Sequence, residues 1–157
     1  MNYWLMKSEP QVYSITDLEK EGKTIWDGVR NYQARNFLRE MKEGDLAFFY
    51  HSNTKPPGIV GLMEIVKSEV VDPTQFDKTS RYYDPKSSVE SPRWHTVVVQ
   101  FVEVFPHFLE LSTLKQEFSD QELWVTRRGN RLSVMPVSQA VAHKIIGITK
   151  ATNSSQR

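Results

Sequence analysis

The chain has 157 residues, of which 39% are hydrophobic and 25% charged, and these values are typical of one globular domain with its own core. It has no cysteine, which excludes a disulfide framework, a thiolate metal site and a cysteine nucleophile. The formal net charge of +1 argues against indiscriminate binding of polyanions, so any contact with nucleic acid must come from a local patch.

Strands and helices alternate along the chain. The predicted strands are 3–7, 45–51, 59–71, 94–104 and 132–137. The predicted helices are a short one from Ser14 to Gly22, one over 31–42, one over 112–118 that Ser112 caps, and one over 138–146. The stretch 73–91 is polar and contains two prolines, with a third next to it at Pro92, which predicts a long loop with one helical turn. This order predicts an α+β fold, in which a mixed, mainly antiparallel β-barrel is flanked by short helices.

The ends of the chain predict where the domain lies. We expect one domain over residues 1–148 and a flexible tail over 149–157. Residues 1–7 include no basic leader before an apolar stretch, and no run of about 18 apolar residues occurs. We therefore expect no membrane partner and no secretion, with a location in the cytoplasm, or in the nucleus of a eukaryote. Nothing in the sequence indicates an oligomeric state.

The segment Trp26–Asn36 does not follow a simple amphipathic pattern. It places an aromatic ring, an Asp27-Gly28 turn and several hydrogen-bonding side chains before a helix, as a pocket for a flat polar ligand requires. Trp26 is either a wall of such a pocket or an ordinary core residue. Asn31 either presents its amide to the edge of a base or only caps the helix.

Other candidate base contacts lie at the ends of predicted strands, and they are Ser8, Tyr50, His51, Ser52 and Trp94. Ser8 is either a contact to a bound base or a turn hydroxyl that bonds its own backbone. Trp94 is either a second stacking ring or a core residue. None of the four histidines has a second ligand at metal spacing, so we expect no metal site.

Arginines form two groups. Arg30 and Arg35 flank the predicted pocket, whereas Arg127, Arg128 and Arg131 lie in one late loop. Either group could be a solvated surface. Either could also contact a nucleic-acid backbone, which positions the ligand without reading its sequence.

Four segments occur in one order along the chain: Lys7–Pro10, Trp26–Asn36, Phe48–Ser52 and Arg131–Val137. Together they resemble the EVE domain family, and the resemblance extends from Met1 to about Ile148. It implies a PUA-like β-barrel related to the YTH domain, whose known relatives hold a modified nucleobase in an aromatic pocket. It further implies that Trp26 forms a wall of this pocket and that Ser8 lies against the base.

We therefore interpret the chain as a non-catalytic module that binds DNA or RNA through one modified base, a modified cytosine or a methylated purine, extruded into an aromatic pocket. No cofactor is expected. Two alternatives stay open: an enzyme that acts on a small nucleotide or heterocycle in the same pocket through His51 or Glu9, and a PUA-like RNA-binding module that uses its outer surface. The sequence has no Walker loop, nucleophile elbow, dinucleotide fingerprint or zincin helix, which favours the non-catalytic interpretation.

Overall fold

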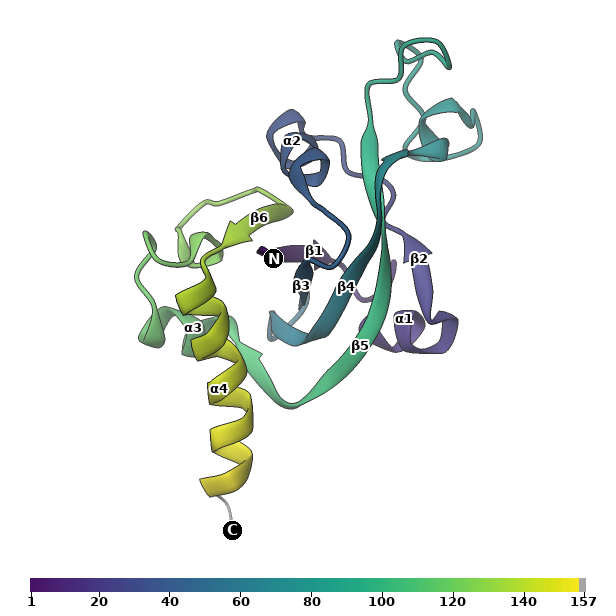
Figure 1. Ribbon diagram of the computed structural model, residues 1–157. Helices are drawn as coiled ribbons and strands as arrows, with labels where there is room; N and C mark the ends of the chain where they lie inside the picture. The colour runs from purple at the N-terminus through teal and green to yellow at the C-terminus, as the bar shows by residue number, and fades with distance from the viewer. Residues whose placement is uncertain (156–157) are drawn as a thin grey trace.

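The computed structural model describes residues 1–155, in which one mixed six-stranded sheet is surrounded by four α-helices (Figure 1). The strands are β1 (Tyr3–Ser8), β2 (Lys23–Ile25), β3 (Leu46–His51), β4 (Gly58–Val71), β5 (His95–Glu110) and β6 (Val134–Val137). The helices are α1 (Ile15–Glu21), α2 (Tyr32–Glu40), α3 (Leu111–Glu117) and α4 (Gln139–Ser155), with short 3₁₀ turns η1 (Pro73–Phe76) and η2 (Trp124–Thr126). No helix within residues 1–155 combines the length and apolar character needed to cross a membrane.

The sheet is curled and mainly antiparallel. Its order is β2-β5-β4-β3-β1-β6, and β1 with β3 is its one parallel pair among the described residues. The long strands β4 and β5 bend together through several register shifts. At Gly61 a Cβ atom would come within 2.4 Å of the Glu103 carbonyl oxygen, so the close approach of these strands depends on glycine there. The predicted fold class is confirmed, although in residues 1–155 the edge strands β2 and β6 do not pair to close the barrel.

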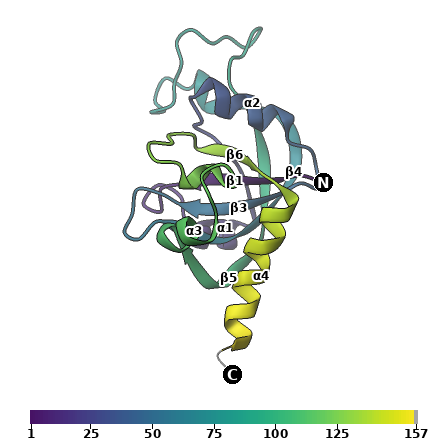
Figure 2. The ribbon, with the colours of Figure 1, turned by 90° about the vertical axis from the view of Figure 1, so that its left-hand side faces the viewer.

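Both faces of the sheet are covered. In β1, Tyr3 and Leu5 belong to one core cluster, whereas Trp4 and Met6 belong to the other. Buried residues of α4 join the first cluster and those of α2 join the second, and Figure 2 shows these two helices apart from one another. Because β1 and β3 are buried on two sides, their sequences do not alternate between polar and apolar residues.

Local signals determine where the first two helices begin. Ser14 Oγ accepts from the Asp17 N–H at 3.1 Å, and the Asp17 carboxylate accepts from the Ser14 N–H at 2.9 Å. The bonds with Ser14 hold the pKa of Asp17 below its usual value. Asn31 Oδ1 accepts from the Ala34 N–H at 2.9 Å and caps α2. Both predicted helix starts are confirmed.

Four features differ most from the sequence-based expectations. The short strand β2 was not predicted, because three residues are too few to show a period. The prediction that Ser112 caps α3 is wrong, since Glu110 holds that position and makes no side-chain cap bond. Strand β5 continues to Glu110. Helix α4 continues to Ser155, so residues 149–155 of the expected tail are helical, while residues 156–157 lie outside the described part of the chain.

Candidate functional site

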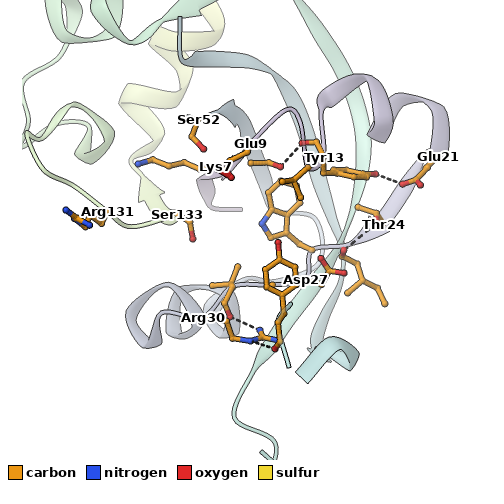
Figure 3. A pocket seen from close by; sticks show the side chains of 17 residues that line it. Lys7, Glu9, Tyr13, Glu21, Thr24, Asp27, Arg30, Ser52, Arg131 and Ser133 are labelled. Atoms are coloured by element: carbon orange, nitrogen blue, oxygen red, sulfur yellow. Dashed lines mark hydrogen bonds between the residues drawn. The ribbon is translucent and has the colours of Figure 1, made fainter. Parts of the chain in front are cut away.

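A cavity of about 690 Å³ opens where β1 and β3 end (Figure 3). This volume is within the range of small-ligand sites. The segment after β2 supplies one wall, and loops before α1, β5 and β6 supply the others. The lining residues are Lys7, Ser8, Glu9, Val12, Tyr13, Glu21, Thr24, Ile25, Trp26, Asp27, Gly28, Val29, Arg30, Ser52, Tyr82, Arg131 and Ser133.

Trp26 is both a core residue and a wall of the cavity. Its backbone N–H donates to the Val97 carbonyl at 3.0 Å, and its carbonyl accepts from the Thr96 hydroxyl. Its ring packs edge-on against Phe49, with ring centroids 5.3 Å apart. Only 6% of the residue is exposed, so the two interpretations drawn from the sequence are compatible with each other.

The indole N–H of Trp26 faces open space. Within residues 1–155 it has no hydrogen-bond partner, and no fully buried polar side-chain atom there lacks a partner. Nε1 must therefore be accessible, and the cavity is the space that Trp26 borders. By contrast, the indole N–H of Trp4 donates to Asp45 at 3.0 Å and that of Trp94 to Asp84 at 2.7 Å. The unpaired N–H of Trp26 is a donor available to a ligand.

The predicted turn after Trp26 is present and has a packing reason. Gly28 has a φ of +85°, and a Cβ atom added there would lie 2.6 Å from the ring of Tyr82. Glycine therefore serves both the backbone conformation and the close approach of the ring. Tyr82 comes from the long loop, and its place in the cavity lining was not predicted.

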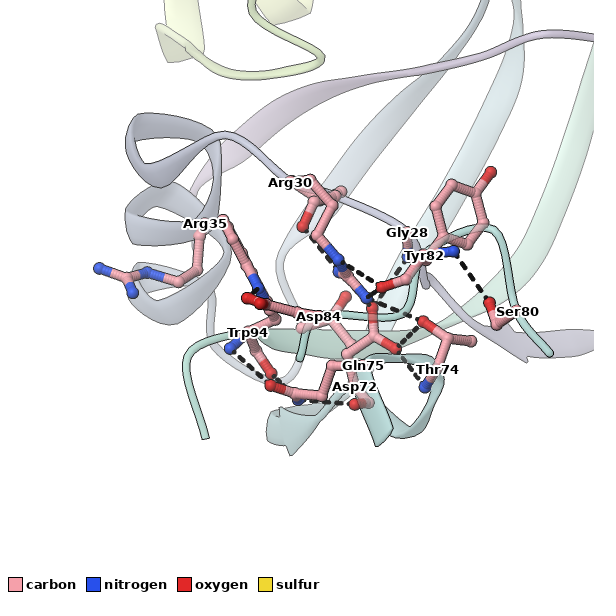
Figure 4. Close-up of polar contacts among 12 residues, drawn as sticks. Gly28, Arg30, Arg35, Asp72, Thr74, Gln75, Ser80, Tyr82, Asp84 and Trp94 are labelled. Carbon is pink, nitrogen blue, oxygen red and sulfur yellow. Dashed lines mark hydrogen bonds and ion pairs between the residues drawn. The ribbon is translucent and has the colours of Figure 1, made fainter. Parts of the chain in front are cut away.

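Arg30 fixes the long loop to the cavity wall (Figure 4). Its Nε and Nη2 donate to the Tyr82 carbonyl at 3.0 and 2.7 Å. Its Nη1 donates to Asp72 at 3.0 Å and to the Val29 carbonyl at 2.9 Å. Nη2 also donates to the Thr74 hydroxyl at 3.0 Å. All five N–H groups of the guanidinium are thus bonded within the chain.

The same loop is ordered by a buried amide. Gln75 Nε2 donates to the carbonyls of Asp72 and Trp94 at 2.6 and 2.8 Å, and its Oε1 accepts from the Trp94 N–H at 3.1 Å. The loop predicted over 73–91 is therefore held at both ends, and η1 is its predicted helical turn. This anchoring determines where Tyr82 lies.

Two carboxylates, those of Glu21 and Asp27, line one end of the cavity. Burial, followed by the charge of Asp72, raises the pKa of Asp27. The Tyr13 hydroxyl donates to Glu21, and burial together with this bond raises the pKa of Tyr13. Sequence patterns did not single out these acidic and phenolic groups, because they lie in loops and at a helix end, where no period marks a shared face.

Of the predicted base contacts, three line the cavity: Ser8, Trp26 and Ser52. The Ser8 hydroxyl donates to the Tyr13 carbonyl at 2.6 Å, which is the turn arrangement, and its oxygen can still accept a bond. Ser52 Oγ has no partner within residues 1–155.

The other predicted base contacts lie away from the cavity lining. Asn31 is exposed and caps α2, whereas Tyr50 is buried in the core, where burial raises its pKa to about 12. His51 Nε2 accepts from the Ile15 N–H at 3.1 Å, and burial lowers its pKa. Trp94 stacks on Tyr32 with ring centroids 4.9 Å apart. A direct base contact by any of these four stays a prediction.

Of the predicted backbone-binding arginines, Arg30 and Arg131 line the cavity. Arg35 donates to the Arg93 carbonyl at 2.9 Å, and Arg127 donates to the Asp120 carbonyl at 2.8 Å. Arg127 and Arg128 are exposed outside the cavity. Contacts of all these arginines with a nucleic-acid backbone stay predictions. In the described part of the chain, no cluster of three or more histidine or acidic residues is placed to hold a metal.

A model of the EVE domain matches residues 2–148. The chain belongs to the EVE domain family. It is 46% identical to thymocyte nuclear protein 1 of Rattus norvegicus, over 98% of this chain and 76% of that protein. It is 55% identical to the Mus musculus protein of the same name, over 73% of this chain and 55% of that protein, so the aligned part is little more than half of the mouse protein.

Solved structures agree with this membership. A Pseudomonas syringae protein has a TM-score of 0.90 and 49% identity, over 94% of this chain and 99% of that one. Human THYN1 in complex with 5-methylcytosine containing DNA has a TM-score of 0.88 and 44% identity, over 95% of this chain and 98% of that one. The Mmi1 YTH domain shares the fold, with a TM-score of 0.56 and 12% identity, over 98% of this chain and 90% of that one. The predicted family and its PUA-like, YTH-related fold are confirmed.

Proposed function

We propose that this chain is a non-catalytic nucleic-acid-binding module that holds one modified base, a modified cytosine or a methylated purine, in the cavity beside Trp26. The observation that carries the proposal is the accessible indole N–H, unpaired within residues 1–155, on the wall of a cavity large enough for a nucleotide. The human relative crystallised with 5-methylcytosine containing DNA supports a methylated cytosine as the first ligand to test.

The polar groups of the cavity suit the edge of cytosine. Cytosine offers an amino donor at N4 and acceptors at N3 and O2. The Asp27 carboxylate can accept from the amino group, and the Trp26 N–H can donate to a ring acceptor. Thymine carries the same methyl group as 5-methylcytosine but has an acceptor at position 4, which would face the carboxylate. We therefore expect 5-methylcytosine to bind more tightly than thymine.

The interaction energies are compatible with an extruded base. Extrusion costs a few kcal/mol. Stacking returns roughly 1–3 kcal/mol per base, and one good bidentate contact about as much again. Because Trp26 is only 6% exposed, part of the aromatic contact must come from Tyr13 and Tyr82. A buried methyl group adds about 0.8 kcal/mol, which corresponds to about a fourfold preference.

The geometry gives the enzyme alternative little support. His51 does not line the cavity, and its Nε2 already accepts from a backbone N–H. Glu9 does line the cavity, but its carboxylate accepts from Asn53 at 2.7 Å. A general base must reach the proton that it removes. Chromatography of a nucleoside panel incubated with the protein tests this alternative, which predicts turnover.

The proposal is tested by titrating oligonucleotides that differ only in one base: cytosine, 5-methylcytosine or thymine. We expect about a fourfold preference for 5-methylcytosine over cytosine. Trp26→Phe, which keeps a ring but removes the N–H, should weaken binding of the 5-methylcytosine oligonucleotide. Lys115→Gln, at an exposed residue of α3 outside the cavity, is the comparison variant. Equal affinity for all three oligonucleotides, unchanged by Trp26→Phe, would refute the proposal.

The outer-surface alternative predicts a different pattern. Replacing Arg127 and Arg128 together would then abolish binding, while Trp26→Phe would have no effect. The cavity proposal predicts that the preference for the methylated base survives the double replacement.

A further inference from the structure

Four donor side chains gather at the end of the cavity opposite Glu21 and Asp27, and we call this group the strand-end rim. Figure 3 shows them on one side of the cavity, with Tyr13, Glu21 and Asp27 on the other. The members of the strand-end rim are Lys7, Ser52, Arg131 and Ser133.

The backbone holds the strand-end rim in place. Lys7 lies in β1, Ser52 follows β3 directly, and Ser133 precedes β6 directly. The Lys7 N–H donates to the Ser133 carbonyl at 2.8 Å, and the Ser52 N–H donates to the Ser8 carbonyl at 3.0 Å. Three neighbouring strands of the sheet therefore bring these side chains to one edge, although they are far apart in sequence.

The side chains of the strand-end rim have no hydrogen-bond or ion-pair partners of their own. Within residues 1–155, the Lys7 ammonium, the Arg131 guanidinium and the two serine hydroxyls make no hydrogen bond or ion pair with other groups. None of these polar atoms is fully buried, so all four groups are accessible from the cavity or from solvent.

Lys7 differs from an ordinary surface lysine in its burial. Its side chain is half-buried, and its Nζ lies 5.9 Å from the centre of the Tyr50 ring. Burial lowers its pKa, because no carboxylate compensates for the lost water. An ammonium that is partly desolvated without a counter-ion costs free energy, which a bound anion would recover.

We propose that the strand-end rim binds the phosphate group next to the extruded base. This inference rests on the proposed function, because it assumes that the ligand is a nucleotide within a nucleic acid. An ammonium, a guanidinium and two hydroxyls are donors, and phosphodiester oxygens are pure acceptors. The carboxylate on this side of the cavity, that of Glu9, already accepts from Asn53 at 2.7 Å. The contact fixes position and does not read the base.

The two ends of the cavity then orient the nucleotide. Asp27 and Glu21 would repel a phosphate, whereas Lys7 and Arg131 would attract it. The base therefore lies toward Trp26 and the phosphate toward the strand ends. A ligand with the opposite orientation would place like charges together at one end and leave the donors at the other end without an acceptor.

The first test is the salt dependence of binding to the 5-methylcytosine oligonucleotide. Lys7→Gln removes one phosphate contact, which should reduce the slope of log K against log salt by about 0.7–0.9 and weaken binding about five- to eightfold at 0.1 M salt. Lys115→Gln is the matched control, because Lys115 is an exposed lysine on α3 outside the cavity. An unchanged slope in Lys7→Gln would overturn the proposal.

The second test locates the phosphate. Oligonucleotides that carry one neutral methylphosphonate are scanned on either side of the 5-methylcytosine. The wild-type protein should lose affinity at one adjacent position, while Lys7→Gln should lose little there, because its contact is already absent. Equal losses for both proteins at every position would overturn the proposal. Unfolding curves serve to check that each variant is folded.

These outcomes are separate from the failure of the proposed function. A reduced salt slope in Lys7→Gln with an intact preference for the methylated base supports both proposals. A reduced slope without any base preference in the wild-type protein supports the phosphate site and refutes the base pocket.

Discussion

Two cationic regions border the same cavity, and they differ in what their donors already bind. Arg30 uses all five of its N–H groups on its own chain, and its partner Asp72 is buried. Lys7 and Arg131, within the strand-end rim, bond to nothing in residues 1–155. The comparison shows that positive charge beside a cavity does not identify a ligand contact. A cation whose N–H donors are already bonded within the chain is structural, whereas one whose donors are unbonded is available to a ligand.

Removing Arg30 should have the largest effect, and it should act on stability. Arg30→Met leaves the buried Asp72 carboxylate without its ion pair, which costs roughly 2–4 kcal/mol of unfolding free energy because Asp72 keeps its backbone hydrogen bonds. Denaturant unfolding measures the loss, and Lys7→Gln is the comparison variant, with stability unchanged or slightly higher. If Arg30→Met kept full stability but lost affinity for DNA, the division between the two regions would be wrong.

A loss of similar size, about 2–4 kcal/mol in all, should follow from Gly28→Ala. The new Cβ atom would meet the Tyr82 ring at 2.6 Å, and the residue would keep a φ of +85°. The left-handed conformation costs about 1 kcal/mol and the overpacking about 1–3 kcal/mol more. Gly129→Ala is the matched control, because Gly129 has a φ of +75° and nothing within 4 Å of the new atom. Equal losses of unfolding free energy in both variants would show that contact with the Tyr82 ring adds nothing to the cost of Gly28→Ala.

The smallest expected effect is on the stability of the protein at acid pH, and it comes from His51, the residue before Ser52 of the strand-end rim. The pKa of His51 is below its ordinary value of 6.5, because burial disfavours the charged ring. Below pH 6.5 the unfolded chain binds a proton that the folded protein does not, so stability falls as the pH falls toward the folded pKa of His51. Unfolding curves at about pH 7.5 and about pH 5 should show a smaller loss in His51→Gln, whose amide oxygen can still accept from the Ile15 N–H. His95, whose pKa is also lowered by burial, titrates in both proteins. An identical loss in both would contradict the prediction.

Much of the fold could be predicted from the sequence, because its signals are local. The Ser14 capping box, the Asn31 cap and the long β5 run each depend on neighbouring residues. The site was harder to predict. Trp26 was found through the family resemblance and its turn, whereas Lys7, Ser133 and Tyr82 reach the cavity through strand pairing and loop anchoring, which no sequence period records.

The central claim is that a base contacts the indole N–H of Trp26, and the indole region of the ¹H–¹⁵N NMR spectrum tests it most directly. The chain has four tryptophans, and Trp26→Phe assigns the resonance of Trp26. Trp4 and Trp94 are internal controls, because their N–H groups already donate to Asp45 and Asp84. On titration with the 5-methylcytosine oligonucleotide, the account predicts a large shift of the Trp26 N–H and little change in these two. If binding reaches saturation and the Trp26 N–H resonance does not shift, the account is contradicted.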